Sequence, residues 1–378
     1  MSNNPPLSLY VHLPWCVRKC PYCDFNSHQN KGAIPETKYI QCLLRDLKHD
    51  LNKYRAARPL HTIFIGGGTP SLFSASAIHC LLNAIDQTWG IASNTEITME
   101  ANPGTAEQQR FAAYRNAGVN RLSLGMQSFD DEKLNALGRI HDGAEAIKAI
   151  EIARDAGFTN INVDLMFGLP KQSVQAGLAD LQQAIELQPT HISWYQLTLE
   201  PNTIFYKQPP RLPNEELIFK LQQCGEDLLA ANAFQQYEVS AYAQATKQCQ
   251  HNLNYWQFGD YLGIGAGAHG KITSETGEII RTRKVKQPNS YLQRDNVLAA
   301  ENSISPDDRA FEYMLNTLRL TQAINLQHFT HCTGVSTTAI AAPLKLAAEK
   351  KLISIDGDIL QKTQLGQRFL NDLLALFL

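Results

Sequence analysis

The sequence Cys16-Val-Arg-Lys-Cys20-Pro-Tyr-Cys23 decides the fold, because it places three thiols in one short loop directly after the first expected strand, residues 7–12. Three thiolates with the spacing C-x3-C-x2-C can each bind one iron of a 4Fe-4S cluster. With no fourth cysteine in the motif, the fourth iron would keep an open position, as catalytic metal sites generally do. A structural zinc site would need a further ligand such as His12 or His28. The spacing therefore favours a 4Fe-4S cluster on Cys16, Cys20 and Cys23.

The other five cysteines are scattered along the chain, at positions 42, 80, 224, 249 and 332. Residues 1–15 contain no Lys or Arg and are interrupted by three prolines, which is unlike a secretory signal. We therefore expect a cytoplasmic protein in a reducing compartment, where disulfides are rare and thiols remain available for metal. The five scattered cysteines are expected to be small buried side chains.

Composition excludes several classes of protein. The chain has 378 residues, 44% apolar and 19% charged, which predicts two or three globular domains rather than a disordered chain. Its 34 basic and 36 acidic residues give a net charge of −2, so we expect no nucleic-acid partner. No apolar run approaches 18 residues, so we expect no transmembrane segment.

Outward from the cysteines, short β-branched or aromatic runs alternate with amphipathic stretches, the pattern of βαβ units in an α/β fold. The expected strands are 7–12, 62–65, 96–99, 121–124, 161–166 and 191–197. The expected helices between them are 37–54, 76–88, 107–117, 143–156 and 173–186. Six such units favour a partial (β/α)6 barrel, with an open doubly wound sheet as the alternative.

The pattern changes after the sixth strand, and we divide the chain into three parts. Residues 1–240 form the core barrel, with a last helix at 215–232, and 241–304 form an aromatic and glycine-rich connecting segment. Residues 305–378 predict a winged-helix-like α+β domain with helices 307–320, 326–333, 336–350 and 363–376 and a hairpin 352–361. Basic residues do not outnumber acidic ones in this tail, so packing or covering a substrate is favoured over binding nucleic acid.

Polar and glycine residues recur where the expected barrel strands end. Gly66-Gly67-Gly68-Thr69-Pro70 follows the second strand, and Glu100, Gln127 and Asp164 lie at the third, fourth and fifth strands. Arg139 lies in the loop region after the fourth. Because active sites of such barrels form at the carboxyl ends of the strands, these residues should converge on one site beside the cysteines.

Together these motifs resemble the radical S-adenosylmethionine (SAM) superfamily over roughly the first 240 residues, and more closely its coproporphyrinogen dehydrogenase-like (HemN-like) branch. The resemblance implies that SAM chelates the fourth iron of the cluster. It also implies a set of side chains and backbone groups that bind SAM. They are Gly67, Gly68 and Thr69 for the methionine part, Glu100 for polar groups, Gln127 and Asp164 for the ribose, Arg139 for the carboxylate, and Tyr10 and Tyr22 as aromatic contacts.

Two departures count against oxidation of coproporphyrinogen. The porphyrinogen oxidases of this branch have a fourth cysteine two residues after the third, where this chain has Phe25. They also have an N-terminal extension that helps to enclose substrate, whereas only six residues precede the first expected strand here.

A second motif, His251-Asn-Leu-Asn-Tyr255-Trp256, resembles the H-N-x-x-Y-W motif of the haem chaperones in the same branch. A neutral imidazole can bind haem iron, and aromatic side chains can cover the flat macrocycle. The resemblance therefore implies that His251, Tyr255 and Trp256 contact haem. Cys249 is a less favoured alternative ligand to the iron.

We interpret the chain as a haem chaperone that binds haem and a SAM-ligated 4Fe-4S cluster and passes haem to an unidentified acceptor protein. The alternative is an oxygen-independent coproporphyrinogen III dehydrogenase, or another radical SAM enzyme that acts on a tetrapyrrole. Whether the chain is an enzyme and whether it pairs as a homodimer both stay open at this level.

Overall fold

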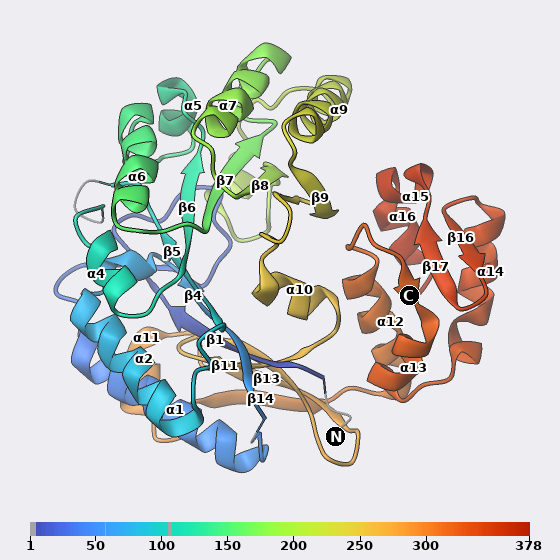
Figure 1. Ribbon diagram of the computed structural model, residues 1–378, viewed down its shortest axis with the longest axis horizontal. Coiled ribbons are helices and arrows are strands. Elements are labelled where there is room, and N and C mark those ends of the chain that lie inside the picture. The colour runs from blue at the N-terminus through green and yellow to red at the C-terminus, as the bar shows by residue number, and fades with distance from the viewer. Residues whose placement is uncertain (1–4, 57, 105–107) are drawn as a thin grey trace.

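A computed structural model describes residues 5–56, 58–104 and 108–378, and these fold around one twelve-stranded sheet (Figure 1). Six neighbouring strands run parallel in chain order, so the partial (β/α)6 barrel is confirmed and the doubly wound alternative is wrong. These strands are β1 (Leu7–Leu13), β4 (Leu60–Gly67), β5 (Glu96–Ala101), β6 (Arg121–Gln127), β7 (Ile161–Phe167) and β8 (His191–Gln196).

Helices cover the convex side of this sheet (Figure 1). Several begin where the sequence predicts, because Ser74, Asp142 and Ser173 each accept a backbone N–H of the first turn. The expected helix 107–117 begins at Phe111, and residues 105–107 lie outside the described residues. The helices are α1 (Glu36–Lys53), α2 (Ala75–Trp89), α4 (Phe111–Asn116), α5 (Asp131–Ala136), α6 (Gly143–Asp155), α7 (Val174–Glu186), α8 (Ile204–Lys207) and α9 (Glu215–Ala231), with a 3-10 turn at Pro70–Leu72. No helix in the described part of the chain is long and apolar enough to cross a membrane.

The segment 241–304, expected to connect two domains, instead adds strands to the barrel sheet. Strand β11 (Asp260–Ile264) pairs in parallel with β1, with Leu7 opposite Asp260 and Val11 opposite Ile264. Antiparallel strands β12 (His269–Thr273), β13 (Ile279–Lys284) and β14 (Leu298–Ser303) follow, and α11 (Pro288–Gln293) lies between the last two. At the other edge, β10 (Ala241–Ala243) and β9 (Gln235–Glu238) extend the sheet beyond β8. Helix α10 (Gln250–Trp256) lies between these two extensions (Figure 1).

The C-terminal part has its own apolar core, built around Tyr313, Met314, Phe329 and Leu360. Its three-stranded sheet and helices have the winged-helix-like arrangement that the sequence predicts. The elements are α12 (Pro306–Thr317), β15 (Ile324–Asn325), α13 (Leu326–Thr333), a 3-10 turn (Thr337–Ile340), α14 (Ala341–Glu349), β16 (Ile353–Asp356), β17 (Ile359–Lys362), α15 (Gln364–Arg368) and α16 (Leu370–Ala375). The single last helix expected at 363–376 is wrong, because Phe369 leaves helical geometry with ψ of 46° and divides it in two.

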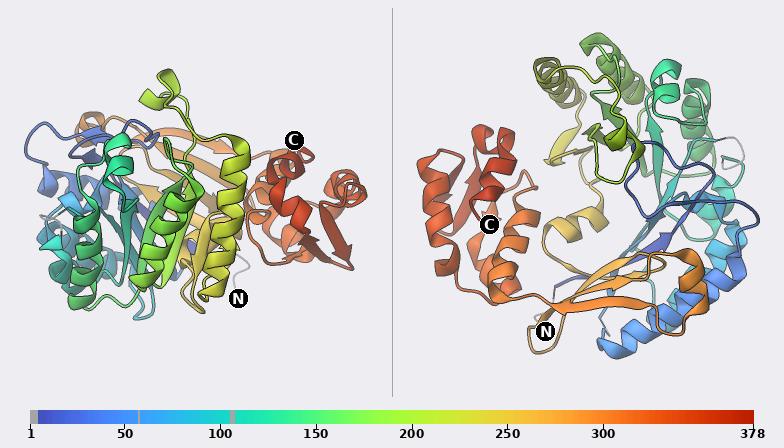
Figure 2. Two further views of the ribbon diagram at one scale, coloured as in Figure 1. Left: turned by 90° about the horizontal axis from the view of Figure 1, so that it is seen from above. Right: turned by 180° about the vertical axis from the view of Figure 1, so that it is seen from behind.

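This C-terminal part lies beside the open side of the curved sheet (Figure 2). At one edge, Thr321 donates its backbone N–H to the Tyr237 carbonyl at 3.0 Å and its hydroxyl to the Gln236 carbonyl at 3.0 Å. At the other edge, Arg281 of β13 forms an ion pair with Glu312 of α12. The C-terminal part therefore contacts both ends of the sheet.

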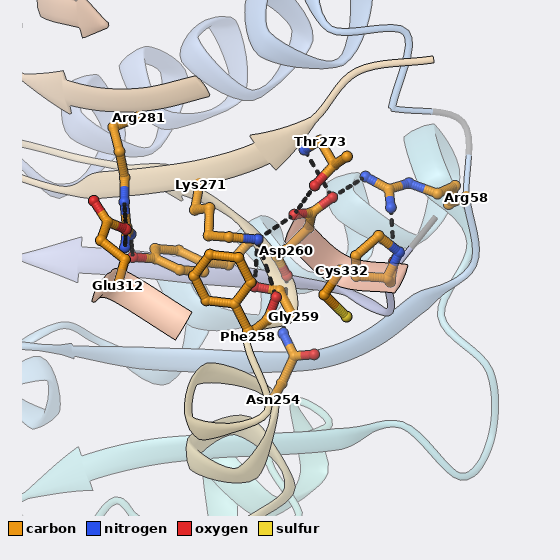
Figure 3. Close-up of polar contacts among 12 residues, drawn as sticks. Arg58, Asn254, Phe258, Gly259, Asp260, Lys271, Thr273, Arg281, Glu312 and Cys332 are labelled. Atoms are coloured by element: carbon orange, nitrogen blue, oxygen red, sulfur yellow. Dashed lines mark hydrogen bonds and ion pairs between the residues drawn. The ribbon is translucent and has the colours of Figure 1, made fainter. Parts of the chain in front are cut away.

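A buried ion cluster fixes the start of β11 (Figure 3). The Asp260 carboxylate is fully buried and accepts from Lys271 Nζ and Arg58 Nη2, both at 2.8 Å. It also accepts from the Thr273 backbone N–H and hydroxyl, both at 2.9 Å. One carboxylate thus joins β11 to β12 and to the segment that precedes β4.

We expect Asp260→Asn to lower the free energy of unfolding by about 3–5 kcal/mol, because it leaves a buried ammonium without its counter-charge. Urea and thermal unfolding measure this loss. The matched control is Glu151→Gln, which removes an exposed ion pair with Lys148 and should cost less than about 1 kcal/mol. Equal losses in the two variants would contradict a large contribution of the Asp260 cluster to the free energy of unfolding.

Candidate functional site

The three motif cysteines lie in a loop that short-range backbone pairing holds against β1. Strand β2 (Trp15–Cys16) pairs in parallel with β3 (His28–Gln29), and the Asn30 N–H donates to the Cys16 carbonyl at 2.8 Å. Inside the loop, the Cys23 N–H donates to the Cys20 carbonyl at 3.1 Å. The cysteines Cys16, Cys20 and Cys23 all line one cavity of about 350 Å³. Burial raises the pKa of the Cys16 and Cys23 thiols.

The same cavity collects eight of the nine residues expected to bind SAM. Most of them come from strands β4 to β7 or the turns that follow these strands, as the barrel geometry predicts, while Tyr22 comes from the cysteine loop and Arg139 from the segment after α5. They are Tyr22, Gly67, Gly68, Thr69, Glu100, Gln127, Arg139 and Asp164.

The glycine loop after β4 packs directly on the strand that leads into the cysteines. The Gly68 N–H donates to the Leu13 carbonyl, and the Thr69 N–H donates to the Trp15 carbonyl, both at 2.8 Å. A Cβ added to Gly68 would lie 2.6 Å from the Trp15 carbonyl oxygen, which is closer than real Cβ contacts come. Glycine is therefore required there, and the cavity wall beside the cysteines is backbone rather than side chain.

Two partly buried carboxyl groups, those of Glu100 and Asp164, line the same cavity. Glu100 accepts the Gly67 N–H at 3.0 Å, and burial, together with repulsion from Asp164, raises its pKa to about 8. Asp164 accepts from Asn162 Nδ2 at 2.8 Å and from the Ser123 hydroxyl at 3.1 Å. Burial raises the pKa of Asp164 as well. A positively charged ligand group would offset the cost of ionising both carboxyl groups in this site.

Arg139 links the strand ends to the cysteine loop. Its Nη2 donates to the Gly125 carbonyl at 2.6 Å and to Asn102 Oδ1 at 2.7 Å, and its Nη1 lies 3.6 Å from Cys20 Sγ. Its Nε is buried and has no hydrogen-bond partner among the described residues. The sequence argument missed Asn102, which also donates to the Thr69 hydroxyl at 3.0 Å. The sequence could have identified Asn102 as a site residue, because it lies two positions after Glu100 at the end of the same strand.

Gln127 ends β6 in a backbone conformation that is rare for residues other than glycine, with φ of 72°. A register shift in the β6–β7 pairing occurs at this point. Its Oε1 accepts from the Tyr195 hydroxyl at 2.8 Å, and Tyr195, which sequence reasoning did not assign, lines the cavity too. Residues held in such strained conformations are concentrated at functional sites.

Tyr10 is the exception among the expected SAM residues. It lines a neighbouring cavity of about 510 Å³, and its hydroxyl pairs with His12 Nδ1 at 2.8 Å. Tyr255 and Trp256 line this second cavity, and the two cavities share Phe25, Gly67 and Glu100 in their walls. The structure therefore places Tyr10 with the residues expected to contact haem.

His251 lies in the barrel interior rather than in a cavity wall. Its side chain is buried, and it lines neither cavity. Its Nδ1 is hydrogen-bonded to the Thr62 hydroxyl at 2.7 Å, and its Nε2 to the Tyr255 hydroxyl at 3.0 Å. Burial lowers its pKa to about 3, so the ring is neutral. Both ring nitrogens therefore have protein partners in this arrangement, and the haem contact expected of His251 stays a prediction. Its buried neighbour Cys249 donates to Glu96 at 3.6 Å and also lines neither cavity.

The raised pKa of Glu100 gives a prediction for stability against pH. The folded protein binds this proton more tightly than the unfolded chain, so the contribution of Glu100 to stability falls as pH rises from 4.5 and levels off above about 8. Relative to the wild type, Glu100→Gln should therefore gain stability over this range, on the order of 5 kcal/mol in total.

Urea unfolding at a series of pH values, without SAM or cluster, measures this difference. The control is Glu216→Gln, which makes the same substitution at an exposed carboxyl group outside the cavity. If the free energy of unfolding of Glu100→Gln varied with pH in parallel with that of the wild type, the Glu100 carboxyl group would not stay protonated near neutral pH, and the prediction would be wrong.

Comparisons with known proteins identify the family and agree with the fold. Residues 10–182 match the Radical SAM superfamily, and residues 304–369 match the HemN C-terminal domain. The chain is 52% identical over its whole length to the heme chaperone HemW of Haemophilus influenzae, covering 99% of that protein. It is 50% identical to the heme chaperone HemW of Escherichia coli, with each chain covered completely. It is similar in structure to coproporphyrinogen III oxidase (HemN) from Escherichia coli, a radical SAM enzyme, with a TM-score of 0.84 and 24% identity over 99% of this chain and 90% of that one. At 24% identity this similarity shows that the two proteins share a fold.

Proposed function

This chain belongs to the HemW family of the radical SAM superfamily, and on that basis we propose that it binds haem beside a SAM-ligated 4Fe-4S cluster and passes the haem to an acceptor protein. The observation that supports this most is the adjacency of the two cavities. One holds the cysteines and most of the expected SAM residues, and the other is lined by the aromatic residues Tyr255 and Trp256.

The residues of the first cavity fit a three-cysteine cluster. Cys16, Cys20 and Cys23 all line it, and the Arg139 guanidinium lies 3.6 Å from one sulfur, where it would offset the negative charge of a thiolate. When bound and reduced, such a cluster would supply a single electron to SAM. In this proposal Cys16, Cys20 and Cys23 would hold the cluster at the wall of this cavity.

The same residues fit a molecule with one carboxylate, one ammonium group and a ribose. The unpartnered Nε–H of Arg139 suits a carboxylate, and the buried Glu100 suits an ammonium group. Gln127 and Asp164 would accept from the ribose hydroxyls, and Gly68 would let the ligand approach the backbone. We therefore keep the predicted SAM roles for these residues and move Tyr10 to the second cavity.

The second cavity has the size of a small-molecule site and aromatic side chains in its wall. Its volume of about 510 Å³ lies within the range of about 300–1,000 Å³ that is usual for small-molecule sites. Trp256 and Tyr255 can cover the macrocycle from α10, and the exposed side chain of Phe25 forms another part of the wall. The oxidases of this branch have cysteine at the Phe25 position, so this residue also favours a haem carrier over a coproporphyrinogen dehydrogenase.

Replacing Cys16, Cys20 or Cys23 by Ala should abolish the cluster after anaerobic reconstitution, because each cysteine holds one iron. Iron and sulfide analysis together with the visible spectrum measure cluster content. The exposed thiol of Cys80 provides the matched control, and Cys80→Ala should keep a full cluster. A full cluster in any of the three motif variants would overturn the assignment.

Titration with haemin should give a Soret band and saturate at one haem per chain, with or without the cluster, because the two cavities have largely separate walls. Incubation of the reconstituted protein with SAM, a reductant and coproporphyrinogen III should yield no protoporphyrinogen. Haem binding without turnover is the result expected of a carrier. Steady formation of protoporphyrinogen would favour the dehydrogenase instead.

A further inference from the structure

The second cavity is bounded by one face of the sheet extension that the sequence did not predict. In the antiparallel pairing, Tyr261 of β11 lies opposite Lys271 of β12, which lies opposite Arg281 of β13. His269 of β12 lies opposite Arg283 of β13. Opposed residues in an antiparallel pair share a face, and so do residues two apart on one strand. One face therefore presents a histidine among cationic and aromatic side chains.

Two of the cations on this face already have partners (Figure 3). Lys271 is buried and pairs with Asp260, and Arg281 pairs with Glu312 and donates to the Tyr261 hydroxyl at 2.6 Å. Arg283 and Lys286 are different, since both side chains are exposed and neither forms an ion pair within the described part of the chain. These two charges are therefore available to an anionic ligand at this face.

His269 differs from the other histidines of this region because its ring nitrogens have no hydrogen-bond partner among the described residues. His12, which also lines the cavity, has both ring nitrogens bonded, to the Tyr10 hydroxyl at 2.8 Å and to the Asn26 carbonyl at 2.9 Å. Both nitrogens of the buried His251 are bonded as well. His269 is exposed and lines the cavity, and its ring takes part in no hydrogen bond among the described residues. Partial desolvation of its ring and the positive charge of nearby Arg283 lower its pKa, which favours the neutral form that binds metals.

We propose that haem occupies the second cavity with His269 as a ligand to its iron and with its two propionates directed to Arg283 and Lys286. This assignment rests on the proposed function, because it identifies the iron ligand and the carboxylate partners of the same haem. A haem has an apolar ring, an iron and two carboxylates. The cavity wall contains aromatic rings, His269 and Lys286, and Arg283 lies opposite His269 in the β12–β13 pairing. The rings of Trp256 and Tyr255 supply the apolar wall.

In this arrangement His251 has a positioning role. It bonds the Tyr255 hydroxyl at 3.0 Å and the Thr62 hydroxyl of β4 at 2.7 Å, so it fixes α10 and the Tyr255 ring against the barrel. Substitution of His251 would therefore weaken haem binding indirectly, through the wall of the cavity, and would leave the axial ligand in place.

The test is optical and resonance Raman titration of the full-length protein with haemin, without SAM. His269→Ala should shift the Soret band, remove the iron–histidine signature and weaken haem binding by at least about tenfold, the low end of the cost of losing a ligand's supporting contact. His251→Gln should weaken binding and keep the iron–histidine signature. His79→Ala on α2, which removes an exposed histidine far along the chain from this cavity, is the matched control and should behave like the wild type.

The possible outcomes distinguish the assignment of His269 as the iron ligand from the proposed haem-carrier function. A histidine signature retained in His269→Ala and lost in His251→Gln would overturn the assignment of His269 and leave a haem carrier. Absence of haem binding in the wild type would overturn the proposed function, and the ligand assignment with it. Because His269 is exposed, its substitution should leave the thermal unfolding midpoint unchanged, which excludes misfolding as the cause of any loss.

The propionate contacts have a separate test with haemin dimethyl ester, which has no free carboxylates. The wild type should bind haemin more tightly than the ester, and the double variant Arg283→Gln, Lys286→Gln should bind the two equally. A preference for haemin that persists in the double variant would overturn the placement of the propionates.

Discussion

Strand β1 supports both halves of the sheet, because it pairs with β4 on one side and with β11 on the other. Its residues Leu7, Leu9, Val11 and Leu13 are almost completely buried, so the strand is the centre of the main core. The cysteine loop begins where β1 ends. The same strand therefore sets the position of the expected cluster relative to the SAM residues on β4 to β7 and relative to the cavity beside β11 and β12.

This central position explains why two cavities lie next to each other. The carboxyl ends of β4 and β5 contribute Gly67 and Glu100, which face both cavities. On the other side of β1, the extension strands and α10 supply aromatic and basic side chains instead. Asn316 of α12 also lines the second cavity, so the C-terminal part, which contacts both edges of the sheet, helps to enclose it.

The sequence predicted the six barrel strands and the convergence of their polar ends, because buried parallel strands are continuous apolar runs followed by loops with polar residues. It did not predict that β11 pairs with β1, since periodicity identifies a strand but not its partner. Tyr255 and Trp256 of the motif at 251–256 line the second cavity, and their contact with haem stays a prediction. The sequence could not show that His251 bonds Thr62, which is distant along the chain. For the same reason the sequence could not show that Tyr10 lies in the second cavity.

The central claim is that haem and the cluster occupy adjacent cavities on either side of the shared wall formed by Phe25, Gly67 and Glu100. Anomalous diffraction at the iron edge, from crystals of the reconstituted protein with haemin, tests it most directly. We expect one iron density bounded by Cys16, Cys20 and Cys23, and a second between α10 and β12 next to His269. A haem iron bound to His251, or one on the outer surface of the sheet, would contradict this account.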